Sequence, residues 1–125
     1  MTINVKISRK KIPYKVAINT LEKRVNDVKN GKKGELIWIL EHPLTYTGGV
    51  RFNKKDILDK NIDVILTNRG GKITVHNPGQ IIIYFVINLN KRKKDIRKFI
   101  NIIEKTIIEV LKKYNIDSRS DRKNI

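Results

Sequence analysis

The residues best suited to hold a ligand lie between Arg69 and Gln80, in the stretch RGGKITVHNPGQ. It contains an arginine, two adjacent glycines and one of the two histidines of the chain. Glycine lets the backbone approach a ligand that any Cβ would keep away, and His76 lies where its ring can face whatever Gly70 and Gly71 admit. A loop of this kind before an apolar strand favours a binding site. A glycine turn that only joins two strands is the alternative.

The spacing within this stretch also predicts how its side chains are arranged. Ile73 and Val75 alternate with polar residues, so Thr74 and His76 are expected to share one face of an extended segment. Pro78-Gly79 predicts a turn. The segment Gln80 to Leu89, with its apolar run Ile81 to Ile87, predicts a central strand that is covered on both faces.

A second candidate region begins with ELIWILEH, residues 35–42. Its apolar run predicts an interior strand, which Pro43 ends because proline cannot donate to a strand ladder. The next segment, Thr45 to Val50 (TYTGGV), is interpreted as a second glycine-bearing loop. His42 lies at the end of the strand, where a hydrogen-bonded structural role is the alternative to a functional one.

The remaining elements are expected to support these two regions. Ile3, Val5 and Ile7 predict a short half-buried strand, and Val64 to Leu66 another. A helix is expected to begin with Pro13 at its first position and to stop at Asn30-Gly31. Arg51 to Asn61 indicates a short helical turn or loop. A last helix, starting at Asp95, carries an apolar stripe to Tyr114 that is wide enough for burial over more than half its circumference. The order predicts one α+β domain over residues 1–125, a mixed sheet packed against helices.

Composition limits the classes of function. The chain has 125 residues, no cysteine and a formal net charge of +16. The lack of cysteine excludes a disulfide scaffold and a cysteine nucleophile within these residues and favours a cytoplasmic protein. No apolar run is long enough to span a membrane. The charge favours acidic partners, but the lysines are scattered over separate loops and aromatic residues make up only 6%. A nucleic-acid-binding protein is therefore the less favoured alternative.

Two motifs together carry a resemblance to a known family. EHPLTYTGG and RGGKITVHNPGQ, in this order, resemble the motifs E-H-P-x-x-Y-T-x-G and R-G-G-x-x-T-x-H-x-P-G-Q of the octanoyltransferases, also called lipoyl(octanoyl) transferases or lipoate-protein ligase B. The resemblance runs from about the first strand to the last residues. The related ATP-using lipoate ligases carry a longer glycine run and lack the Pro-Gly-Gln ending, so the chain is more similar to the transferases.

The resemblance implies a fold, an activity and a set of site residues. The fold would be that of the biotin/lipoate transferase-ligase catalytic domain. The reaction would move octanoyl from octanoyl-acyl carrier protein to a lysine on lipoyl domains of 2-oxo acid dehydrogenases or on the glycine cleavage H protein. No cofactor or metal is implied. The substrate-binding stretch maps onto Arg69, Gly70, Gly71, Lys72, Ile73, Thr74, Val75 and His76. Ile73 and Val75 would line the octanoyl tunnel, and His42 and Tyr46 would line the same pocket.

The sequence departs from the family in one respect. The nucleophilic cysteine of the family, and the lysine that favours its thiolate, lie C-terminal to the last helix found here. No catalytic residue can therefore be assigned, and the chain is expected to be the N-terminal part of an octanoyltransferase, incomplete at the C-terminal side and inactive alone. A truncated gene product, a pseudogene-like remnant and an incomplete sequence all fit this expectation. An acyl-carrier or acyl-chain binding module without turnover is the alternative function.

Overall fold

The apolar run Leu36–Leu40 forms strand β2, the central strand of a three-stranded sheet in the computed structural model, which describes residues 2–121. Strand β1 (Asn4–Ile7) pairs with β2 in parallel, and β6 (Ile82–Val86) pairs with it antiparallel. The predicted interior strand is thus confirmed. Its side chains alternate between buried and half-buried, as expected for a strand covered on one face.

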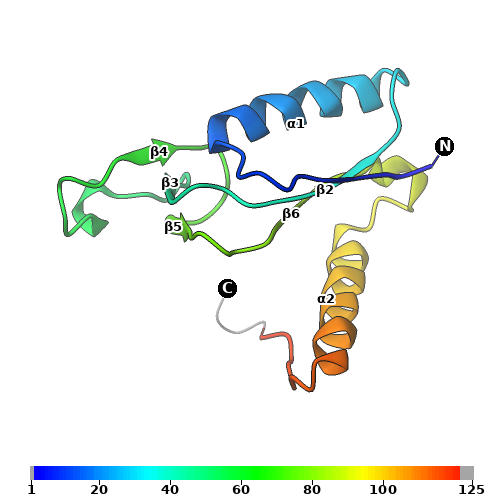
Figure 1. Cartoon of the computed structure of the whole chain (residues 1–125). Coiled ribbons are helices and arrows are strands. Elements are labelled where there is room, and N and C mark those ends of the chain that lie inside the picture. Colours follow the sequence, from blue (N-terminus) through cyan, green and yellow to red (C-terminus); the bar gives the residue numbers. More distant parts are fainter. Residues whose placement is uncertain (1, 122–125) are drawn as a thin grey trace. The chain divides into compact units, whose positions relative to one another are not determined.

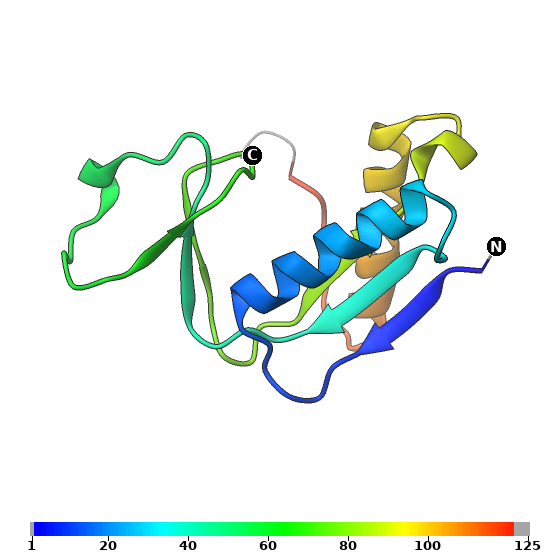
Figure 2. The same cartoon turned by 90° about the horizontal axis from the view of Figure 1, so that it is seen from above.

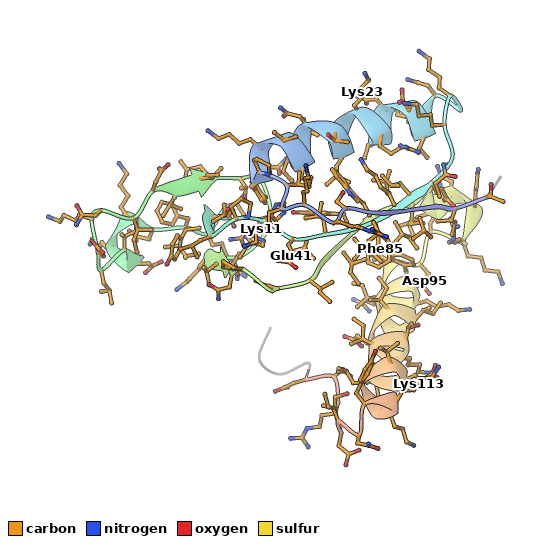
Figure 3. All side chains as sticks on the ribbon, in the orientation of Figure 1. Lys11, Lys23, Glu41, Phe85, Asp95 and Lys113 are labelled. Carbon is orange, nitrogen blue, oxygen red and sulfur yellow. The ribbon has the colours of Figure 1, made fainter. Side chains whose placement is uncertain are left out.

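Helix α1 (Tyr14–Lys29) covers one face of this sheet, as both views show (Figure 1, Figure 2). Pro13 is the N-cap residue rather than the first helical residue, and the helix ends at Asn30 followed by Gly31 with φ +67°. Lys23 lies on the outer side of the helix (Figure 3). The inner side of the helix packs on alternate residues of β2 and on β6. Together the three elements form the buried core, which consists of Ala17, Leu21, Leu36, Trp38, Leu40 and Val86. Burial of each large side chain contributes roughly 1.5–3 kcal/mol.

A second three-stranded sheet, in the order β4-β3-β5, carries both glycine regions. Strand β3 (Thr45–Gly48) lies in its centre, parallel to β4 (Val64–Leu66) and antiparallel to β5 (Ile73–His76). A short 3-10 turn, η1 (Lys54–Asp56), lies between β3 and β4. Both sheets mix parallel and antiparallel pairs, so the predicted α+β class with mixed sheets is confirmed.

Three local predictions are wrong. The segment 45–50 is not simply a loop, because its first four residues form β3. The segment 80–89 is not a central strand: within residues 2–121, β6 lies at the edge of its sheet. The β1 strand exists, but its alternating apolar residues are exposed, with Val5 at 63% and Ile7 at 67%. Register explains this exposure, since Val5 and Ile7 share a row with Ile37 and Ile39, which alternate with the α1-facing residues of β2.

The chain divides into two compact units, Met1–Ile87 and Asn88–Ile125. The second unit consists of a 3-10 turn, η2 (Leu89–Lys91), and helix α2 (Ile96–Lys113). Asp95, labelled in Figure 3, caps α2 as predicted, its carboxylate accepting the Lys98 N–H at 2.9 Å. The predicted burial of α2 is wrong, because none of its residues is buried and Ile96 is 50% exposed. No helix within residues 2–121 has the length and apolar character needed to cross a membrane.

Candidate functional site

The two histidines lie at the two connections between the sheets, one on the segment after β2 and the other at the end of β5. His42 follows β2 and continues the alternation of Leu36, Trp38 and Leu40, so its side chain points to the α1 side and is only 1% exposed. His76 is the last residue of β5. The connecting segments are themselves joined, because the Gly79 N–H donates to the Glu41 carboxylate at 3.0 Å (Glu41 is labelled in Figure 3).

The turn that follows His76 fixes the second connection. The Gln80 N–H donates to the Asn77 carbonyl at 3.1 Å, and the Gln80 side chain accepts the Asn77 N–H at 3.0 Å. Gly79 has φ +82° directly after Pro78. This geometry is that of a turn with proline second and glycine third, which requires a residue that tolerates positive φ. The predicted Pro-Gly turn is confirmed.

Four aromatic rings from four parts of the fold meet beside these histidines, and we call them the ring cluster: Tyr14, His42, His76 and Tyr84. The His42 and His76 centroids are 5.4 Å apart with planes at 86°. Tyr14, the first residue of α1, lies 5.4 Å from His42 and 5.6 Å from His76. Tyr84 of β6 lies 5.8 Å from His42. The three contacts of His42 are edge-to-face and the Tyr14–His76 contact is tilted at 38°. Ring contacts at these centroid distances are favourable, so the cluster helps to fix where His76 lies.

Arg69 braces from within the loop of residues 69–72, which we call the glycine loop. Its guanidinium donates to the Thr47 carbonyl at 2.6 Å, to the Thr47 hydroxyl at 3.0 and 3.2 Å, and to the carbonyls of Gly70 and Lys72 at 2.9 and 2.8 Å. Thr47 is fully buried in β3. Hydrogen bonds from a charged donor are the stronger kind, so Arg69 holds the loop against β3.

The glycines of the two motifs have different roles. A Cβ on Gly49 would lie 2.8 Å from the Arg69 carbonyl oxygen and 2.9 Å from that of Gly70, and would also contact the Gly71 oxygen. Gly49 therefore lets the segment after β3 pack against the loop. A Cβ on Gly70, in contrast, would meet nothing within 4 Å. Gly71 has φ +91°, a conformation that favours glycine.

The predicted site residues fall on two faces of the β4-β3-β5 sheet. Thr45 is paired with His76 and Thr47 with Thr74, and directly opposed residues point to the same side. Tyr46 is paired with Val75, and Gly48 with Ile73, on the other side. The structure thus brings His42 beside His76, but it places Tyr46, Ile73 and Val75 on the opposite face from His76. Lys72 is exposed and contributes its carbonyl to the loop.

Burial and one cation set the electrostatics of the ring cluster. Burial lowers the pKa of His76 below its ordinary value of 6.5, and His42 and the Arg69 charge lower it further, whereas a hydrogen bond that the ring donates to the Thr45 backbone raises it. Burial raises the pKa of the Tyr14 hydroxyl, and the Arg69 charge opposes that rise. Burial, with a smaller effect of Tyr14, raises the pKa of Tyr84 to about 12. His76 and Tyr84 are therefore uncharged at neutral pH.

A cleft of about 350 Å³ opens between α1 and β4 beside Tyr14. Its lining includes the apolar side chains of Ile18, Ile65 and Leu66 and the polar side chains of Lys15, Glu22 and Asn68. Ile73 and Val75 do not line this cleft. In the part of the chain that the structure describes, no group of three histidine or carboxylate side chains is placed to hold a metal ion.

Sequence reasoning missed four residues of this region. Tyr14 falls in the helix that is expected to begin at Pro13, and Tyr84 falls in the apolar run 81–87, and neither position by itself indicates a site. Each is a hydroxyl-bearing residue in an otherwise apolar pattern, and that was the available signal. Thr47 and Gly49 lay in a segment interpreted as a loop, so their contacts with residues 69–71 were not foreseen.

Comparison with known proteins identifies a family and close relatives. The sequence matches the family described as lipoyl protein ligase A/B catalytic domain over residues 13–124. It is 43% identical over 119 residues to the octanoyltransferase of Wolbachia pipientis wMel, covering 93% of this chain and 58% of that protein. It is 38% identical over 127 residues to the octanoyltransferase of Anaplasma phagocytophilum (strain HZ), covering all of this chain and 61% of the relative. The chain therefore spans little more than half the length of these curated relatives.

Proposed function

Because the chain belongs to the lipoyl protein ligase A/B catalytic domain family, we propose that it provides the acyl-substrate site of an octanoyltransferase in lipoate biosynthesis. The proposed donor is octanoyl-acyl carrier protein. The proposed acceptors are lysines on lipoyl domains of 2-oxo acid dehydrogenases or on the glycine cleavage H protein. The family match extends through both structural units, which supports one catalytic domain over residues 1–125. A cytoplasmic location stays a prediction.

The glycine loop is the observation that carries this proposal. Among residues 2–121, neither the Gly70 N–H nor the Gly71 N–H donates a hydrogen bond. These two backbone donors lie next to Arg69, whose charge acts on His76 and Tyr14. Backbone N–H groups close to a fixed positive charge suit a carbonyl oxygen that gains negative charge in acyl transfer. The open space at Gly70 leaves room for the thioester.

His76 supplies a second polar atom suited to a ligand. Its Nδ1 is buried and has no hydrogen-bond partner among the described residues. A buried polar atom without a partner is rare in folded proteins and needs an explanation. A polar group of the acyl substrate, held between the loop and the ring cluster, would provide the partner.

The chemistry of transfer needs a nucleophile that these residues do not supply. The 125 residues contain no cysteine, and hydroxyl groups are weak nucleophiles without an aligned base. We therefore propose that this chain by itself binds the acyl donor without turnover, and that the thiolate of an acyl-enzyme route comes from outside it. Incubation with octanoyl-acyl carrier protein and an apo lipoyl domain, followed by mass spectrometry, tests this. Octanoylated lysine formed by the purified chain would contradict it.

Binding to the acyl carrier gives the sharper test of the glycine loop. Gly70→Val adds a branched side chain where the structure is open, so the fold is expected to persist while the affinity for octanoyl-acyl carrier protein falls at least about tenfold, or 1.4 kcal/mol. Gly71→Val is the comparison variant, because its φ of +91° makes any side chain strained. It is expected to lose thermal stability as well as affinity. Unchanged titration of Gly70→Val would contradict the proposed site.

A basic segment of the second unit suits the proposed carrier. Residues 91–98 read KRKKDIRK, with six cations and one carboxylate. They border a hollow of about 410 Å³ whose apolar lining comes from Phe99 and Ile102. Acyl carrier proteins are acidic, and complementary charge accelerates association and selects the partner. Reversal of Lys93 and Lys94 to glutamate is therefore expected to weaken carrier binding and to reduce its salt dependence.

The chain offers a matched control for this charge reversal. Lys54→Glu with Lys55→Glu makes the same change in net charge in η1, far along the sequence from the basic segment. The control pair is expected to change carrier affinity much less than the Lys93 and Lys94 pair. Equal losses for both pairs would show that only the total charge matters and would reject this docking surface.

A further inference from the structure

Both ring nitrogens of His42 are occupied by hydrogen bonds within the protein. Nδ1 lies 2.6 Å from the Ile12 carbonyl oxygen, and Nε2 lies 2.8 Å from the Tyr84 hydroxyl. The side chain is 1% exposed, so water does not compete for either nitrogen. A carbonyl oxygen can only accept. The proton of the neutral ring must therefore be on Nδ1.

This assignment fixes the direction of the second bond. In a neutral imidazole with its proton on Nδ1, Nε2 is an acceptor, so the Tyr84 hydroxyl must donate to it. The result is a directed chain, from Tyr84 O–H to His42 Nε2 and from His42 Nδ1–H to the Ile12 carbonyl. Burial keeps the Tyr84 hydroxyl protonated, with a pKa of about 12, so the donor is present at every physiological pH.

His76 differs from His42 in each of these respects. Its Nδ1 has no partner among the described residues, and the ring is only partly buried. The His42 ring, held at both ends, meets His76 at 86° and 5.4 Å, and Tyr14 lies against both rings at 5.4 and 5.6 Å. His42 is thus held at both ring nitrogens, whereas His76 is held by the rings around it and by a hydrogen bond with the Thr45 backbone, and its Nδ1 has no partner among the described residues.

We propose that Tyr84 and His42 are positioning residues, which form a fixed hydrogen-bond chain that holds His76 in place as the imidazole available to the acyl substrate. The functional part of this assignment rests on the proposed acyl-substrate site. The groups that face His76 are Tyr14 from α1, His42 after β2, the Thr45 backbone of β3 and the Arg69 charge. Because His42 has no unoccupied nitrogen, it does not exchange a proton with the substrate.

Nitrogen-15 NMR of the imidazole rings tests this in the chain as it exists. The chain has two histidines, so long-range proton–nitrogen spectra give two ring systems. In mildly alkaline solution, His42 should show a protonated Nδ1 and an acceptor Nε2. Tyr84→Phe removes the donor to Nε2, so the Nε2 resonance should move downfield, and the His76 signals should move with it. Tyr114→Phe, at a tyrosine that is 73% exposed, should leave both rings unchanged.

Three outcomes would overturn the proposal. A proton on Nε2 of His42 in the wild-type chain would contradict the directed chain, and this measurement needs no variant to fold. An unchanged Nε2 resonance in folded Tyr84→Phe would contradict the hydroxyl donor. Movement of His42 without any movement of His76 would show that Tyr84 supports His42 alone. None of these spectra needs a ligand, so they can fail or succeed independently of octanoyl-carrier binding.

Discussion

Replacement of Gly49 by alanine is expected to destabilise the sheet that carries the glycine loop. The added Cβ would lie 2.8 and 2.9 Å from the carbonyl oxygens of Arg69 and Gly70, and it would also contact the oxygen of Gly71. These obstacles are backbone atoms, which cannot rotate away as a flexible side chain can. The methyl group therefore fits only if the segment after β3 and the loop move apart.

The magnitude follows from what this separation disrupts. Overpacking of a close contact costs about 1–3 kcal/mol, and a backbone obstacle favours the upper end of this range. Three hydrogen bonds join the same segments: Gly49 N–H to Lys72 O at 2.8 Å, Val50 N–H to Arg69 O at 2.9 Å, and Arg51 N–H to Gly71 O at 3.0 Å. Each contributes about 0.5–1.5 kcal/mol. A loss of about 3–5 kcal/mol is expected, a large part of the 5–15 kcal/mol that is typical of a domain.

Urea unfolding followed by circular dichroism measures this loss. Gly70→Ala is the matched control, because it makes the same chemical change in the glycine loop that faces Gly49, at a position where a Cβ meets nothing within 4 Å. It is expected to change the free energy of unfolding by no more than about 0.5 kcal/mol. If both variants unfold at the wild-type urea concentration, or if Gly70→Ala loses as much as Gly49→Ala, the assigned roles of the two glycines are wrong.

Three further predictions concern single side chains. Thr47→Val keeps the shape of the side chain but removes the hydroxyl that accepts hydrogen bonds from Arg69. In urea unfolding it should lower the free energy of unfolding by about 1.5–3 kcal/mol. An unchanged midpoint would show that the hydrogen bonds from Arg69 to carbonyl groups suffice. The pKa of His76 is lower in the folded protein than in the unfolded state. As the pH falls below 6.5, the unfolded state therefore takes up a proton first, and the free energy of unfolding should decrease. This decrease should be steeper in the wild-type chain than in His76→Asn. The pKa of Tyr84 is raised to about 12, so its contribution to stability is complete below its ordinary value of 10 and is lost as the pH rises towards 12; Tyr84→Phe should lack this alkaline loss.

The main elements could be predicted because their patterns are strong. The run Leu36–Leu40 has the length and apolar character of a strand, and the flanking signals Pro13 and Asn30-Gly31 bracket α1 to within a residue. The failures come from tertiary context. The segment 45–50 has the two adjacent glycines of a loop, yet Gly48 belongs to a packed strand: a Cβ there would lie 2.9 Å from the Phe52 ring.

The candidate site was only partly predictable for a similar reason. Both histidines and the glycine loop were identified from motifs, but their partners depend on how the strands pair. Arg69 meets Thr47, which is 22 residues earlier, only because β3 pairs with β5. Tyr84 reaches His42 across the pairing of β2 with β6. Motif spacing also could not separate the two faces of β3, and so it placed Tyr46 with His76.

The central claim is that the glycine loop and His76 together receive the acyl group. Imidazole NMR during titration with octanoyl-acyl carrier protein, and with carrier protein that bears no acyl group, tests this most directly. The octanoyl form should shift the His76 ring signals well beyond those of His42, whose nitrogens are both occupied, and the form without an acyl group should not. His76 signals that stay in place while the chain is saturated with octanoyl-acyl carrier protein would contradict the claim.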